Sequence, residues 1–160
     1  MRMFRKIIDQ IDEIKIGISN FWKWRKIIWN DRNYDHNFFL KIMKTKLEIM
    51  LNNWEDEDVY VGQEKDKEKM KICIYLLNRL ISENYDDNAF YFHNKKWGKL
   101  RYNESNFFPM LTRSKIRTKE DAEQERKEFQ RLMFHEDYLI NQDLDYLFKL
   151  LKRHLRKWWL

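Results

Sequence analysis

Turn-forming residues are scarce in this chain, and their scarcity restricts the folds open to it. The 160 residues include only 3 glycines and 1 proline. Sheet-rich folds need such residues at nearly every turn, because they supply the backbone angles of tight turns. Hydrophobic residues make up 43% of the chain, which is enough to form a buried core. The sequence therefore predicts a mainly all-α fold, as a single helical domain over residues 1–160.

Apolar residues recur at helical spacing in three long segments. Long helices are expected near residues 34–53, 68–84 and 141–158. Their apolar stripes place four leucines in the expected core: Leu47, Leu77, Leu147 and Leu151.

Shorter helices are expected at three further places. One covers residues 3–14 and is ended or kinked by Gly17, and a second covers the Trp-rich residues 20–29. The sequence from Thr118 to Asp121 resembles a capping box, which would open a charged helix to about Met133.

The helical pattern fails around residues 88–117, which predicts a loop-rich insertion. Residues 89–93 and 97–102 favour two short strands, so that a β-hairpin is one option for this insertion. Pro109 and the irregular residues beyond it indicate loop.

Residues 88–119 carry the strongest sign of a binding site, because 8 basic and 7 aromatic residues interleave there. Cations neutralise phosphates, and aromatic rings stack on bases. We take Trp97 as a candidate stacking ring and Lys99 and Arg101 as candidate phosphate contacts. The alternative is that the aromatic residues anchor a loop to the core while the basic residues stay solvated.

A second candidate site surrounds Trp24 and Arg25 and continues to Arg32. Arginine presents a planar fork that binds phosphate through two hydrogen bonds, and Trp24 would stack on a base. The alternative is a capped turn, in which Asp31 or Asn33 accepts hydrogen bonds from the first amides of the following helix. A third basic run, in residues 149–157, either complements a helix dipole or contacts nucleic acid or an acidic partner.

Several segments together resemble a family of uncharacterised small proteins encoded by tailed bacteriophages. They are Trp22–Arg25, Trp29–His36, Trp97-Gly98, Gln142–Lys149 and Trp158-Trp159. The resemblance carries no catalytic motif. It implies a phage origin, a location in the host cytoplasm and a role as an accessory protein that acts by binding.

No enzymatic chemistry is expected from the sequence. The three glycines stand at positions 17, 62 and 98, too far apart for a phosphate loop. The four histidines have no partners at zinc-ligand spacing, and the lone Cys73 fits a reducing compartment. We therefore expect no catalytic residue, no metal and no cofactor.

A cytoplasmic protein without a membrane partner is expected. No apolar run reaches the roughly 18 residues of a membrane span, and Asp9 comes too early for a secretory signal.

The favoured hypothesis is an anti-defence protein that sequesters a nucleotide-like anionic ligand, such as an immune signalling nucleotide. The alternatives are a nucleic-acid-binding phage protein and a helical protein inhibitor of a host enzyme. A homo-oligomer is left open.

Overall fold

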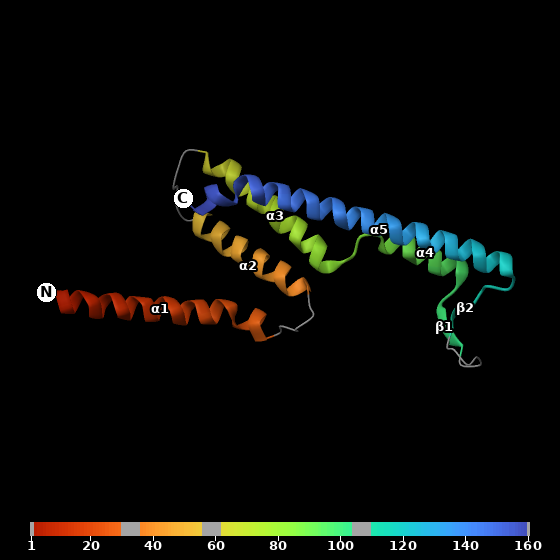
Figure 1. Cartoon of the computed structure of the whole chain (residues 1–160), viewed down its shortest axis with the longest axis horizontal. Coiled ribbons are helices and arrows are strands. Elements are labelled where there is room, and N and C mark those ends of the chain that lie inside the picture. Colours follow the sequence, from red (N-terminus) through yellow and green to blue (C-terminus); the bar gives the residue numbers. More distant parts are fainter. Residues whose placement is uncertain (1, 30–35, 56–61, 104–109, 160) are drawn as a thin grey trace.

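The fold is given by a computed structural model that describes residues 2–29, 36–55, 62–103 and 110–159. Helices dominate this part of the chain, so the predicted all-α fold is confirmed (Figure 1). In chain order the elements are α1 (Arg2–Trp29), α2 (His36–Glu55), α3 (Gln63–Ser82), α4 (Asp87–Trp97), β1 (Leu100–Asn103), β2 (Met110–Arg113), α5 (Lys119–His154) and the 3-10 helix η1 (Leu155–Trp159).

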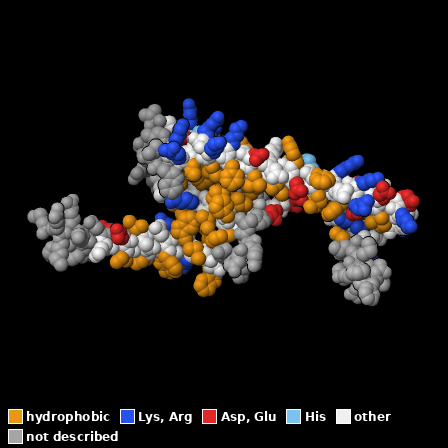
Figure 2. All heavy atoms as spheres, viewed as in Figure 1, with side chains coloured by type: hydrophobic (Ala, Val, Ile, Leu, Met, Phe, Trp, Pro, Cys, Tyr) orange, Lys and Arg blue, Asp and Glu red, His pale blue; other side chains and the backbone are white. Residues whose placement is uncertain are grey.

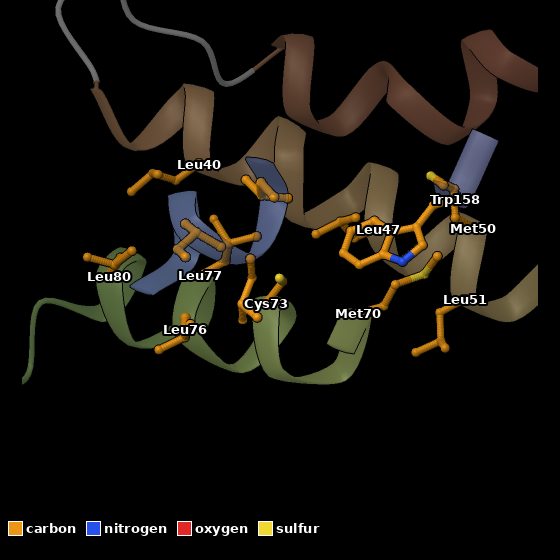
Figure 3. Packing of buried hydrophobic residues seen from close by; sticks show 13 residues of the cluster. Leu40, Leu47, Met50, Leu51, Met70, Cys73, Leu76, Leu77, Leu80 and Trp158 are labelled. Carbon is orange, nitrogen blue, oxygen red and sulfur yellow. The ribbon is translucent and has the colours of Figure 1, made fainter. Parts of the chain in front are cut away.

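The core lies where α2, α3 and the C-terminal half of α5 pack together (Figures 1 and 3). The four leucines predicted for the core, Leu47, Leu77, Leu147 and Leu151, are all buried, which confirms that prediction. Trp158 of η1 folds back against Leu47 and Met70, as Figure 3 shows. Burial of these side chains supplies the main favourable free energy of folding.

A buried polar contact joins α3 to α5 beside this core. The Tyr85 hydroxyl donates to Oδ2 of Asp143 at 2.8 Å, and Nε of Arg79 lies 3.3 Å from the same oxygen. Desolvation, followed by the hydrogen bond to Asp143, raises the pKa of Tyr85 well above its ordinary value. The contact fixes α5 against α3 at the edge of the apolar core.

The helix α5 is longer than the sequence analysis predicted. Separate helices to about Met133 and from about Asn141 were expected, but one helix runs from Lys119 to His154. At 1.5 Å per residue, its 36 residues span about 54 Å. The residues between the two expected segments contain no glycine or proline, so nothing interrupts the helix. The predicted capping box is confirmed, with the Thr118 hydroxyl accepting from the Asp121 amide at 3.0 Å.

The helix α1 is also continuous, contrary to the expected break at Gly17. A glycine inside a helix costs only about 1 kcal/mol relative to alanine, which long flanking helical segments can offset. Figure 1 shows that the N-terminal half of α1 extends beyond α2. Nothing lies within 4 Å of the space that a Cβ at Gly17 would occupy.

The insertion between α3 and α5 is partly helical. Residues 89–93 were expected to form a strand, but they lie in α4. The hairpin forms later in the chain, where Leu100 pairs with Arg113 and Asn103 with Met110 in antiparallel register. Gly98, with φ of 84°, ends α4, and a Cβ there would collide with the side chain of Ser114.

Candidate anion-binding sites

Trp97 is part of the protein interior. Its side chain is 6% exposed, and its indole N–H donates to Oε2 of Glu128 at 2.7 Å. The Lys96 ammonium binds the other oxygen of that carboxylate at 2.6 Å and lies 4.6 Å from the centre of the Trp97 ring. These contacts, with Lys96 the larger cause, lower the pKa of Glu128 to about 2. The ring therefore helps to hold α4 against α5.

Arg113 is likewise engaged within the fold. It is 7% exposed, and its guanidinium forms an ion pair with Glu125 and a hydrogen bond to the side chain of Asn94. His93, buried beside Glu125, has its Nε2 atom 3.6 Å from the carboxylate. Some of the basic and aromatic side chains of residues 88–119 thus hold the hairpin against α4 and α5.

Lys99 and Arg101 keep the exposed positions that an anion contact requires. Lys99 lies just before β1, and Arg101 lies within it. Residues two apart on an extended chain face the same side, so these two cations are placed together. Neither makes an ion pair within the described ranges, and both stay candidates for contact with a phosphate.

The second predicted group lies at the C-terminal end of α1. Trp24 is half-buried, whereas Arg25 is exposed with its guanidinium 4.0 Å from the centre of the Trp22 ring. Arg32 lies outside the described residues.

The structure does not bring the two predicted groups together. Trp24 and Arg25 are on α1, and Trp97, Lys99 and Arg101 are at the far end of α4 and on the hairpin (Figure 1). The core of α2, α3 and α5 lies between them. One small ligand cannot contact both groups in this arrangement.

A pocket of about 390 Å³ lies beside the second group, between α1 and α2. Its lining includes three lysines, namely Lys26 from α1 and Lys41 and Lys44 from α2. Apolar surface comes from Ile27, Phe38 and Ile81, with the hydroxyl-bearing Thr45 among them, and no carboxylate is present among the lining residues that the structure describes. Lys44 lies 3.6 Å from Glu48, one turn along α2.

This pocket combines the features of a small anion site. Its volume falls within the range of about 300–1,000 Å³ that is usual for ligand pockets. Ammonium groups attract phosphate, and the Phe38 ring offers a surface for a base. Trp24, singled out from the sequence, lies on α1 near this pocket, but the three lysines that line it were not predicted. The spacing of Lys41 and Lys44, three residues apart on one helix face, was the available signal.

A separate cationic surface lies where α5 ends and α3 begins. Figure 2 shows Lys and Arg side chains gathered at this end of the molecule. The lysines and arginines of the C-terminal basic run predicted from the sequence are exposed and make no ion pair within the described part of the chain: Lys149, Lys152, Arg153, Arg156 and Lys157. His154 of the same run is half-buried, with its Nδ1 atom 3.7 Å from Asp66.

An apolar groove of about 420 Å³ lies between α2, α3 and α5, and its charged lining residues are acidic, unlike those of the α1–α2 pocket. Phe39 and Phe148 are exposed along it, while Glu83 and Glu136 also line it. Desolvation and the neighbouring carboxylates, led by Asp137, raise the pKa of Glu136. The groove is unsuited to an anion.

Neither a metal cluster nor an activated thiol is present in the described ranges. These residues contain no cluster of three or more His, Cys, Asp or Glu side chains arranged to hold a metal. Burial raises the pKa of the Cys73 thiol to about 11, so it is a poor nucleophile at neutral pH. Nor does any described helix combine the length and apolarity needed to cross a bilayer.

Comparison with known proteins yields no relative, since no family model, no curated protein and no solved structure matches the chain.

Proposed function

We propose that this protein binds a small nucleotide-like anion in the pocket between α1 and α2 and holds it without changing it chemically. The observation that carries the proposal is the lining of that pocket, where lysines from two helices surround apolar and aromatic surface and none of the described lining residues is a carboxylate. Phosphate groups would contact Lys26, Lys41 and Lys44, and a base or ribose would cover Phe38. In a tailed-phage accessory protein, such binding would sequester a signalling nucleotide.

Mass spectrometry of small molecules released by denaturing the purified protein would identify a bound ligand. Calorimetry with ATP, ADP-ribose, a cyclic dinucleotide and inorganic phosphate would then measure affinity. A charge-assisted contact is worth about 1.5–3 kcal/mol, so losing one lysine should weaken binding roughly 10- to 100-fold. Lys41→Gln and Lys44→Gln test this, and Lys119→Gln is the matched control because it removes an equal charge from an exposed position at the far end of α5 (Figure 1).

Affinity that falls in the two pocket variants and persists in the control would support the proposal. Unchanged affinity for every probe in both pocket variants would refute this site. Arg101→Ala tests the hairpin separately, because this exposed side chain has no structural contact to lose among the described residues.

Nucleic-acid binding is the second candidate function, and the unpaired cations at the end of α5 favour it. Lys149, Lys152, Arg153 and Arg156 recur at helical spacing, so they line one face. A protein that neutralises several phosphates of duplex DNA loses affinity with a log–log salt slope of about −0.9 per phosphate. Steep salt dependence that Lys152→Gln reduces would favour this second function, whereas a small ligand in the α1–α2 pocket predicts a shallow slope.

A further inference from the structure

The helix α1 exposes a regular apolar seam. The seam consists of apolar residues spaced alternately by three and four positions: Ile11, Ile14, Ile18, Phe21 and Ile28. The same spacing includes Arg25, which is the one position of the seam that is not apolar. The apolar residues of the seam are between 47% and 65% exposed. This spacing is the heptad pattern of a coiled coil, in which the a and d positions face a partner helix.

The seam faces away from the body of the protein. Among the side chains described on α1, those of residues 10–29, only Trp24 and Ile27 are half-buried. At about 100° per residue, Ile27 lies about 180° around the helix from Ile18. The helix α1 thus contacts α2 through the side that carries Ile27 and leaves the seam uncovered by any other described part of the chain; Figure 2 shows apolar residues exposed along α1.

The exposed area is large enough for a stable interface. Phe21, Trp22 and Trp29 are 65%, 57% and 88% exposed. With about 150–250 Å² per aromatic side chain, these three alone expose on the order of 400 Å². A standard protein interface buries roughly 800 Å² on each partner, and the isoleucines of the seam supply much of the remainder.

We propose that α1 forms an antiparallel two-stranded coiled coil with α1 of a second copy of this chain. In the antiparallel orientation, the seam of one copy matches the seam of the other. When Ile14 of one helix lies opposite Ile18 of the other copy, Ile11 of the first helix lies opposite Phe21 of that copy. Two-fold symmetry repeats each pair, as closed dimers require.

Arg25 explains the choice of orientation. In a parallel pair, Arg25 of each helix would lie in the same layer of the seam, and like charges would meet there. The antiparallel register instead places Arg25 opposite position 7, which is an isoleucine in the sequence. The arginine stem can then cover apolar surface while the guanidinium stays at the edge, near Trp22.

A second copy fits α1 better than a membrane surface does. Helices that lie on anionic lipid have wide apolar faces and basic polar faces. Here the seam follows the heptad spacing, and the polar side of α1 mixes Asp12 and Glu13 with Lys15, Lys23 and Lys26 instead of being wholly basic. Anionic headgroups would repel both carboxylates.

Light scattering after size exclusion tests the dimer with a matched pair of variants. Ile14 and Ile16 are 62% and 61% exposed, but only Ile14 lies on the seam. Ile14→Lys should convert the dimer to a monomer, and Ile16→Lys should leave it intact. A wild-type monomer at about 100 µM, or equal behaviour of the two variants, would overturn the proposal. So would a wild-type monomer that binds phosphatidylserine vesicles through this face.

A variant with one added cysteine tests the orientation, because the native Cys73 is buried in the core. In the antiparallel pair, residue 28 of one copy lies opposite residue 4 of the other, so the two residues 28 are about 36 Å apart. Ile28→Cys should therefore form no intermolecular disulfide under mild oxidation, while mixed Ile14→Cys and Ile18→Cys chains should cross-link. Rapid cross-linking of Ile28→Cys alone would refute the antiparallel arrangement. These experiments need no ligand, so their outcome is independent of the anion pocket.

Discussion

Replacing Leu147 by alanine tests whether the C-terminal half of α5 belongs to the core. Leu147 is fully buried, within the cluster that includes Met70, Cys73 and Leu77. The substitution removes three carbons, worth about 2.4 kcal/mol of transfer free energy at ~0.8 kcal/mol each. The residual cavity adds to this loss, so the free energy of unfolding should fall by about 2–5 kcal/mol. Met70 is flexible enough to fill part of the cavity, which favours the middle of that range.

Thermal and urea unfolding followed by circular dichroism would measure the effect. In a chain of this size each kcal/mol lowers Tm by roughly 2–4 °C, so Leu147→Ala should lower it by about 4–20 °C. Leu155→Ala is the matched control, since Leu155 is 40% exposed and lies just beyond the C-terminus of α5. An unchanged Tm for Leu147→Ala, or an equal loss in the control, would refute the packing of α5 described here.

The other predictions concern the two polar contacts that join helices. Because Lys96 and Trp97 hold the pKa of Glu128 near 2, below its ordinary 4.5, the carboxylate stabilises the fold above pH 4.5 and loses that contribution as the pH falls toward 2. Glu128→Gln should therefore lose less stability than the wild type between pH 6 and pH 3 in urea unfolding, and an identical loss would contradict the contact. Tyr85→Phe removes the donor to Asp143 and should lower the free energy of unfolding by about 1–3 kcal/mol, since the acceptor is charged and buried. Tyr91→Phe, at a 61% exposed position, should change it little, and equal effects in the two variants would argue against the Tyr85 contact.

The failed predictions of helix ends share one cause. Breaks were expected at Gly17 and between about Met133 and Asn141, yet α1 and α5 run through both. A residue with a weak preference against helix stays helical when the helical segments on both sides are long, and in α5 these segments also pack against other elements. Residues 89–93 show the same effect, because Phe90 and His93 are placed by α4 against Phe129 of α5.

The candidate sites depended more strongly on folding than the helices did. Sequence analysis grouped Trp97 with Lys99 and Arg101 as a binding surface, but only the fold shows Trp97 buried against Glu128 while the two cations remain exposed. Trp97 and Glu128 are 31 residues apart, and no local pattern links them. The α1–α2 pocket likewise gathers Lys26 and Ile81 from distant parts of the chain.

The sequence by itself determined the helical class, the leucine core and the capping box at Thr118. Each of these depends on interactions between residues no more than about four apart or on apolar spacing, which can be read directly along the chain. Only the tertiary structure decided which cations are neutralised and which stay exposed. Arg113 pairs with Glu125 because the fold places the end of β2 beside α5, whereas the lysines and arginines at the end of α5 form no ion pair in the described ranges. The electrostatic energy and the pKa of an ionisable side chain depend most strongly on charged groups within a few ångströms. Which groups come that close is determined by the folding of the chain.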